Sequence, residues 1–296
     1  MSIMVAHWLE IIGSFSMVIT TTIALTISFL YLINILLTKG CTTPVSTLLS
    51  ANTFLAALTY SSAHFSIAIS MFRSDLATKD NIRMNFYNSF CMSSAFTFYS
   101  GCALLYYSYV MQAAQRFVRV VLHDYPWLYE RRTQLIFIVC QWLSCISITL
   151  IPLVIAKPIK YNIYLNMCVI PITSNGWTMY YAIFCYSIPL ICLSLIYYRL
   201  INYILSVRSR VSACLISGSL IVAAQRQLAL IQRVIILVTI LTLSGIPYCI
   251  FIGMGFFMEP PKYQFRISFL CVDIALASVI CTMFHFSRNV NQLRRR

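Results

Sequence analysis

At 296 residues and 33.9 kDa the chain has the size of one or two soluble domains, but its composition does not fit a soluble protein. Hydrophobic residues make up 60% of the sequence and charged residues 9%, and the mean hydropathy is +0.82. A soluble domain usually devotes about a quarter of its residues to charged side chains. The composition therefore excludes a water-soluble globule and predicts an integral membrane protein whose apolar surface faces lipid.

Apolar runs along the chain are long enough to cross a bilayer as helices, since about 20 residues cover its ~30 Å hydrocarbon core. The runs are continuous rather than alternating, which excludes the strands of a membrane β-barrel. We expect one all-α domain over 1–296, a bundle of seven transmembrane helices at about 11–37, 45–72, 86–115, 135–156, 177–205, 229–257 and 264–286.

The basic residues predict how this bundle is oriented, because short cytoplasmic loops retain positive charge during insertion. Of the 21 lysines and arginines, 14 fall on the side that carries the C-terminal Arg294–Arg296. We expect the N-terminus outside and the C-terminus in the cytoplasm of a multi-pass plasma-membrane protein. This topology and the anionic inner leaflet explain the net charge of +14, so no nucleic-acid partner is expected.

Most of the 12 cysteines lie within the predicted spans, where a thiol behaves as a small apolar side chain. Cys91 and Cys168 are the two near the oxidising outer face, and we predict a disulfide between them. It would join the outer end of the third span to the loop between the fourth and fifth. The four histidines are scattered in sequence, and no group of residues has the spacing of a zinc site or a catalytic cluster. We therefore expect no metal, no cofactor and no enzymatic activity.

Several residues stand at spacings that occur together in one family of receptors. Arg116, within Gln115-Arg116-Phe117, follows Cys91 by 25 positions (116 − 91 = 25). The fourth, fifth and sixth spans contain a central tryptophan, two prolines and a tyrosine, namely Trp142, Pro189, Pro247 and Tyr197. Together with the topology and the outer disulfide, these landmarks resemble the rhodopsin-like (class A) G protein-coupled receptors, of which the chain looks like a divergent member.

The resemblance implies a coupling mechanism. Gln115, Arg116, Phe117 and Tyr197 would border an inner cleft that opens to a heterotrimeric G protein when the sixth helix moves outward. Two departures from the family pattern bear on this mechanism. The sixth span has Ser244-Gly245-Ile246-Pro247, without the tryptophan that senses ligand in the family, and Gln115 replaces an acidic residue. In the family, the acidic residue forms an ion pair with the neighbouring arginine that stabilises the resting state. Because the neutral amide of Gln115 cannot form this ion pair with Arg116, appreciable basal activity is expected.

The same resemblance implies a ligand cavity lined by Phe98, Cys102, Tyr186, Tyr248 and Asp273. Asp273 is the only acidic residue inside a predicted span, and a carboxylate at that depth needs a partner, a proton or water. We expect it to point into the bundle, as a contact for a cation or as a hydrogen-bond partner of Ser268 or Ser278. No span contains a lysine, which excludes an opsin, and Phe98 stands where amine receptors have an aspartate.

The sequence thus favours a divergent receptor that passes an extracellular signal to a cytoplasmic G protein. Two alternatives remain. The lost motifs also fit a seven-helix scaffold that does not couple to G protein. A small membrane transporter would need inverted repeats, broken helices or several buried charges, which are not evident. The expected partners are the lipid bilayer, an extracellular ligand that the sequence does not name, and a heterotrimeric G protein.

Overall fold

The computed structural model describes residues 3–38, 44–76, 89–122, 124–156, 159–162, 167–171, 176–213, 236, 239–255, 257–258, 261 and 264–295. Within these ranges the chain is mostly helical. Five helices are long and apolar enough to cross a membrane: Glu10–Leu37, Val45–Leu76, Arg131–Ala156, Gly176–Ser206 and Gln264–Phe284. The prediction of a helical, multi-pass membrane protein is confirmed at this level.

The first three helices are α1 (Ile3–Thr38), α2 (Val45–Leu76) and α3 (Ser89–Val121). α1 and α2 contain the first two predicted spans, and α3 contains the third from residue 89 onward, since residues 86–88 lie outside the described part. α2 continues one turn past its predicted end at residue 72. This extension brings Asp75 into the helix. The sequence prediction had Asp273 as the only acidic residue inside a span, and Asp75 is a second one in the membrane helices.

The second half of the chain continues with η1 (Pro126–Tyr129), α4 (Arg131–Ala156), α5 (Gly176–Tyr181), the π-helical turn η2 (Ala182–Ser187), α6 (Ile188–Ala213) and α8 (Gln264–Arg295). α5, η2 and α6 follow one another without a break and form the fifth predicted span. Before α8 comes a shorter apolar helix, Thr239–Met254. The predicted sixth span, 229–257, begins outside the described residues, and this helix covers its second half.

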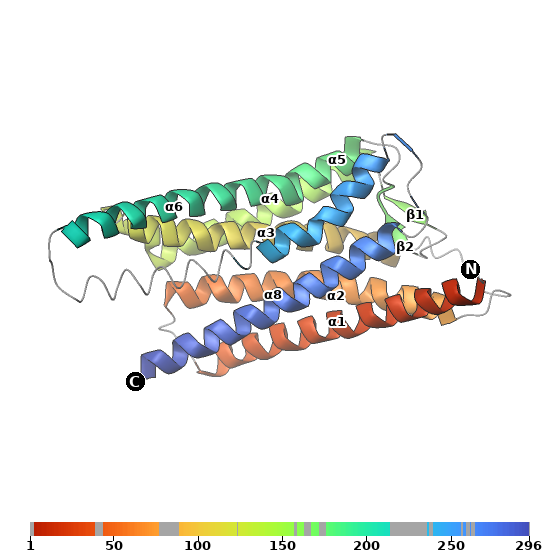
Figure 1. Cartoon of the computed structure of the whole chain (residues 1–296), viewed down its shortest axis with the longest axis horizontal. Helices are drawn as coiled ribbons and strands as arrows, with labels where there is room; N and C mark the ends of the chain where they lie inside the picture. The colour runs from red at the N-terminus through yellow and green to blue at the C-terminus, as the bar shows by residue number, and fades with distance from the viewer. Residues whose placement is uncertain are drawn as a thin grey trace.

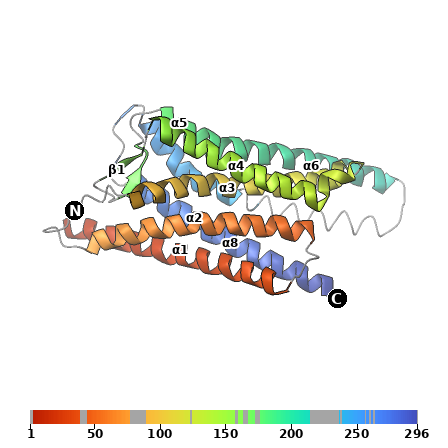
Figure 2. The same ribbon diagram turned by 180° about the vertical axis from the view of Figure 1, so that it is seen from behind.

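The helices run along one common direction, and the two ends of the chain lie at opposite ends of the molecule (Figures 1 and 2). At the N-terminal end a small antiparallel hairpin joins β1 (Lys160–Asn162) to β2 (Met167–Val169), with Tyr161 opposite Cys168. The all-α prediction did not include this hairpin. All three side chains of β2 are buried, so the hairpin packs inward against the helix ends.

Polar and apolar side chains are distributed as a bilayer requires. α4 presents large apolar side chains outward, including Leu143, Ile151 and Val154, and its polar residues Gln141 and Thr149 are buried. Many hydroxyl groups within the helices donate to their own backbone: Thr21 and Thr22 donate to the carbonyls of Met17 and Val18, four residues earlier. This arrangement leaves few unpaired polar groups facing lipid.

Close approach of α2 and α3 depends on Gly101. A Cβ atom added there would lie 2.9 Å from the backbone Cα of Tyr60, so any larger residue would push the helices apart. The contact brings the Tyr60 ring next to the α3 side chains that face the bundle interior. Gly101 therefore sets the position of one wall of the candidate site described below.

Proline-freed carbonyls in α4 are satisfied by tyrosines of α5. Pro152 lies inside α4 and has no N–H to bond the carbonyl of Ile148 four residues earlier. The Tyr180 hydroxyl donates to that carbonyl at 3.2 Å, and the Tyr181 hydroxyl donates to the Thr149 carbonyl at 3.0 Å. These bonds tie α5 to α4 at the level of the proline.

Candidate functional site

A buried ion pair joins the middle of α2 to α8. His64 Nδ1 lies 2.8 Å from Asp273 Oδ1, and both side chains are 0% exposed. The separation is that of an ion pair, although the ring N–H is not aimed closely enough at the oxygen to meet hydrogen-bond geometry. Asp273 therefore faces the interior, as expected for a carboxylate at this depth, and its counter-group is a histidine.

Aromatic rings pack against the His64 imidazole from three helices. The ring centroids of Phe98 (α3), Tyr60 (α2) and Phe269 (α8) lie 4.8, 5.1 and 5.4 Å from that of His64. Phe98 is partly exposed and packs against all three apolar clusters of the core. We call His64, Asp273, Tyr60, Phe98 and Phe269 the buried-pair site.

Two polar atoms of the pair are left unpaired. His64 Nε2 and Asp273 Oδ2 are both buried, and neither has a hydrogen-bond partner among the described residues. The sequence prediction offered Ser268 or Ser278 as partners of Asp273, which is wrong: Ser278 donates to the Ile274 carbonyl, and the buried Ser268 hydroxyl has no partner in the described part. The pair thus has one nitrogen and one oxygen whose hydrogen-bonding capacity is unused among the described residues.

A second ion pair links the same two helices nearer the N-terminal end of the molecule. Arg266 of α8 donates two hydrogen bonds to the two carboxylate oxygens of Asp75 in α2, each 2.7 Å long. The Ser14 hydroxyl of α1 donates to the same carboxylate at 2.5 Å. This bidentate contact, which we call the Arg266–Asp75 clamp, holds α1, α2 and α8 together.

The predicted cavity residues divide between two neighbouring regions. Phe98 and Asp273 belong to the buried-pair site, and Tyr248 packs with Phe98 against the same apolar cluster. Cys102 and Tyr186 pack against another cluster, and the Cys102 thiol lies within electrostatic range of the hydroxyls of Tyr186 and Tyr248. The five residues therefore lie in two adjoining parts of the interior, which share Phe98.

Tyr186 fills the space left by the small residue in the sixth-span motif. Its hydroxyl donates to the Thr242 carbonyl at 2.9 Å, and its ring meets Tyr106 edge-on with centroids 5.3 Å apart. A Cβ atom added to Gly245 would lie 2.0 Å from the Tyr186 hydroxyl oxygen. The absence of a side chain at Gly245 is therefore what lets the Tyr186 ring reach the helix Thr239–Met254.

The predicted coupling residues lie near the C-terminal end of α3. Gln115 is buried and its Nε2 has no partner among the described residues, whereas Arg116 is partly buried. The Tyr197 hydroxyl of α6 lies close enough to the Arg116 guanidinium to interact with it electrostatically, and Arg116 Nη1 has no hydrogen-bond partner among the described residues. Phe117 packs against the apolar cluster that contains Tyr197. Arg116 and Tyr197 thus lie near each other, and their role in coupling stays a prediction.

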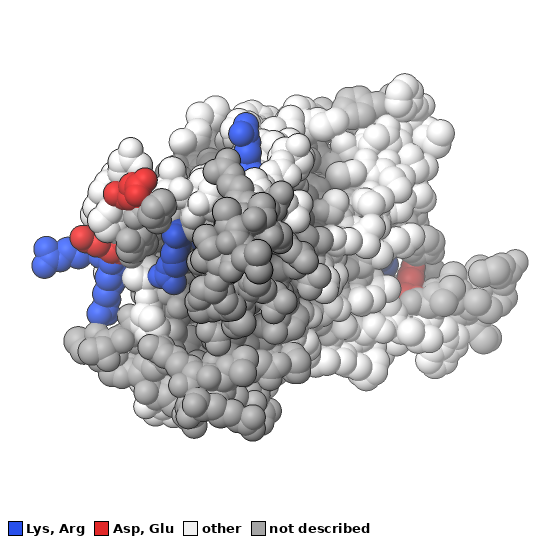
Figure 3. All heavy atoms as spheres, turned by 60° about the vertical axis from the view of Figure 1, so that its left-hand side comes forward, with Lys and Arg blue, Asp and Glu red and all other residues white. Residues whose placement is uncertain are grey.

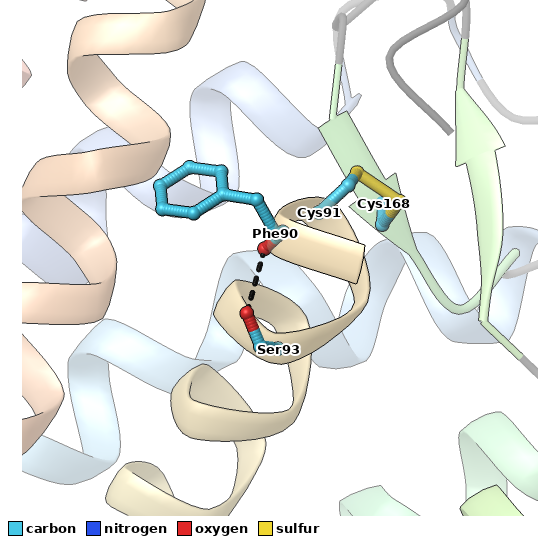
Figure 4. Close-up of a disulfide and its surroundings, with 4 residues drawn as sticks. All are labelled: Phe90, Cys91, Ser93 and Cys168. Carbon is cyan, nitrogen blue, oxygen red and sulfur yellow. Dashed lines mark hydrogen bonds between the residues drawn. A yellow bond between two sulfur atoms is a disulfide. The ribbon is translucent and has the colours of Figure 1, made fainter. Parts of the chain in front are cut away.

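The predicted disulfide is present at the opposite end of α3. Cys91, in the first turn of α3, is bonded to Cys168 of β2, with Cα atoms 5.5 Å apart (Figure 4). The Tyr99 hydroxyl, about two helical turns further along α3, accepts a hydrogen bond from the Ile170 backbone N–H at 3.2 Å. Together the two contacts hold the β2 hairpin against α3.

The remaining landmarks have local structural roles. Trp142 donates to Asn52 Oδ1 at 2.8 Å, and Gln141 accepts from Asn52 Nδ2 at 3.0 Å, so both join α4 to α2. Pro189 is buried directly after the π-helical turn η2, a widened turn that accommodates the missing backbone donor. Pro247 lies within the helix Thr239–Met254, partly buried.

Neither His64 nor the Arg266–Asp75 clamp was predicted from the sequence. A histidine in the middle of an apolar span is itself a signal, because ionisable residues inside membranes are rare and usually paired. Its pairing with Asp273 depends on how α2 and α8 pack, which no local pattern shows. Asp75 was left outside the spans because the predicted second span ended at residue 72, and Arg266, at the start of the predicted seventh span, was given no partner.

Within the described residues, no group of three or more His, Cys, Asp or Glu side chains could hold a metal ion. Comparison with models of known protein families gives no match, and a search of curated proteins gives none either. The functional argument therefore rests on the chain's own geometry.

Proposed function

We propose that the chain is a divergent rhodopsin-like G protein-coupled receptor with seven membrane-spanning helices, an outer N-terminus and a cytoplasmic C-terminus. Chain ends at opposite ends of the bundle support an odd number of crossings (Figure 1). The receptor carries an extracellular signal across the plasma membrane to a heterotrimeric G protein. Its outer end is the one with the Cys91–Cys168 disulfide.

The contact between Arg116 and Tyr197 carries this proposal. It lies at the end of α3 away from the disulfide, where the helices α3 and α6 meet. Movement of the neighbouring helix would expose the guanidinium to a docking G protein. Three exposed arginines at the same end fit a cytoplasmic surface, namely Arg119, Arg131 and Arg132. Most of the charged side chains visible in Figure 3 lie on one side of the view.

The environment of Gln115 supports a weakly held resting state. Its buried amide nitrogen has no partner among the described residues, and a neutral amide carries no charge to hold Arg116 as an adjacent carboxylate would. Without this ion pair the free-energy difference between the resting and active conformations is smaller. Because a few kcal/mol set the populations of two conformations, more of the protein adopts the active one. The receptor is therefore expected to signal without added ligand.

Cells expressing the full chain test the proposal through reporters for each major G protein class. Native protein should signal above empty vector, and Arg116→Ala should lose that signal while its surface expression stays unchanged. Arg119→Ala is the matched control, because it removes an equal charge from the exposed face of the same helix. Equal signals from Arg116→Ala and native protein would refute the coupling role.

A proton-coupled transporter is the second candidate, and the buried His64–Asp273 pair favours it. Chains of histidine and acidic residues inside membranes are typical of proton relays. Purified chain in liposomes with an imposed pH gradient tests this function. Substrate-dependent proton flux that His64→Gln abolishes, together with no signal for any G protein class, would replace the receptor with a transporter.

A further inference from the structure

The strand β2 lies between two apolar clusters of the core. Its side chains Met167 and Val169 belong to one buried cluster, whereas Cys168 and the following Ile170 belong to another. This alternation is the one expected of a strand, because successive side chains point to opposite faces. The four residues are only 1–4% exposed, so β2 is inserted into the disulfide end of the bundle.

The cluster that Met167 and Val169 enter is built by several helices. Its other buried members come from α1, α2, the helix Thr239–Met254 and α8, among them Met17, Ile67, Ile252 and Phe269. Phe98 and Tyr248, two of the side chains that were expected to line a ligand cavity, pack against this cluster. The strand therefore places two of its own side chains in the region where the resemblance implied a ligand.

We propose that β2 is a built-in ligand of the receptor. Met167 and Val169 occupy the place of an extracellular ligand and stabilise the active position of the helix Thr239–Met254. This inference rests on the proposed receptor function and names the ligand of that same site. A separate ligand from outside acts on such a receptor by displacing β2 or by changing how it packs.

Two contacts tether β2 in this position. Cys168, between the two ligand side chains, is bonded to Cys91 in the first turn of α3 (Figure 4). The Ile170 N–H donates to the Tyr99 hydroxyl at 3.2 Å. A ligand tethered through a short linkage has an effective concentration of about millimolar, whereas a free ligand must bind from dilute solution. The strand therefore fills the site without an added ligand, in agreement with the basal signalling expected of the native chain.

The helix Thr239–Met254 connects β2 with the part of the core that contains a coupling residue. Ile252, near its end, lies in the cluster that β2 enters, whereas Leu241 lies in the cluster that contains Tyr197. The two residues are eleven positions apart (252 − 241 = 11), which is about 16 Å along a helix. Packing of β2 at Ile252 therefore acts on the same helix that packs near Tyr197.

Distances between two spin labels on the purified full chain in nanodiscs test the proposal without any G protein. Arg119 of α3 and Ile236, both exposed, are replaced by p-acetylphenylalanine and labelled through its ketone, so the native cysteines stay unlabelled. Met167→Ala combined with Val169→Ala removes the ligand side chains but keeps the disulfide. Because loss of a ligand returns the protein to its resting conformation, the distance distribution should shift to shorter values.

Ile170→Ala is the matched control, because it removes a fully buried side chain from the other face of the same strand. It loses packing but leaves Met167 and Val169 in place, so its distance distribution should stay native. Val169→Ala alone covers the case in which the double variant does not fold, and it should give a smaller shift in the same direction.

Nucleotide exchange on purified G proteins without added ligand gives the second readout. The double variant should lower the basal exchange rate about fivefold or more, which corresponds to the lower end of typical coupling between two sites. Ile170→Ala should keep the native rate.

Three results would overturn the proposal. They are an unchanged distance distribution in the double variant and in Val169→Ala, a shift of the same size in Ile170→Ala, or native exchange by the double variant. Each would make β2 a structural cover of the bundle. If the native chain accelerates exchange on no G protein, the receptor function fails, whereas the distances still decide whether β2 positions the helix Thr239–Met254.

Discussion

Replacing Asp75 with asparagine leaves the Arg266 guanidinium without its carboxylate. In the native chain the guanidinium donates two bonds of 2.7 Å to that group, and Ser14 donates a third of 2.5 Å. The side chains of Arg266 and Asp75 are 15% and 5% exposed. The variant therefore leaves a mostly buried positive charge uncompensated between α1, α2 and α8.

The expected loss of stability follows from this burial. Removing one partner of a buried ion pair costs about 3–5 kcal/mol, and the residual exposure of Arg266 favours the lower end, about 3 kcal/mol. For a chain of this size that loss lowers the melting temperature by about 6–12 °C. The double variant Asp75→Asn with Arg266→Gln should recover more than half of the loss, because it removes the uncompensated charge.

Fluorescence-detected thermal unfolding of purified protein measures both variants against a control. Arg73→Gln removes an exposed charge from the same turn of α2 and should change stability by no more than about 1 kcal/mol. If Asp75→Asn melts at the native temperature, or if the double variant melts no higher than the single one, the Arg266–Asp75 clamp is not a stabilising contact.

Three further changes test other contacts. Gly245→Ala should destabilise the chain by about 1–3 kcal/mol, because the new Cβ would overlap the Tyr186 hydroxyl, and adding Tyr186→Leu should restore part of the melting temperature. Trp142→Phe should cost about 1 kcal/mol in thermal unfolding through its lost bond to α2, and a cost near zero would contradict that contact. Cys91→Ser should lower stability by up to about 4.5 kcal/mol, the loop-closure value for a sequence separation of 77, and a reducing agent should then have no further effect on the melting curve.

The helical membrane architecture could be predicted from the sequence because the bilayer imposes a length and an apolar composition on each span. The disulfide was predictable for a related reason: once the spans are assigned, Cys91 and Cys168 are the two cysteines at the end of the bundle that was expected to lie outside. The end of α2 could not be predicted, because the charged residues Arg73 and Asp75 in its last turn are typical of a loop. That turn is helical because Asp75 is neutralised by Arg266, which lies 191 residues away.

The candidate site was predictable only in part. The burial of Asp273 follows from the cost of exposing a carboxylate to lipid. Its pairing with His64 does not, because it depends on the packing of α2 against α8. The position of Tyr186 over Gly245 is a similar case. Local patterns showed that the tryptophan of the family motif is missing, but not which side chain fills its place.

The coupling proposal is tested most directly by nucleotide exchange on purified heterotrimeric G proteins. Native chain in nanodiscs should accelerate exchange on at least one of the major Gα classes without added ligand, Arg119→Ala should match it, and Arg116→Ala should not exceed empty nanodiscs. If native chain accelerates exchange on none of these classes, the account of the chain as a G protein-coupled receptor is contradicted.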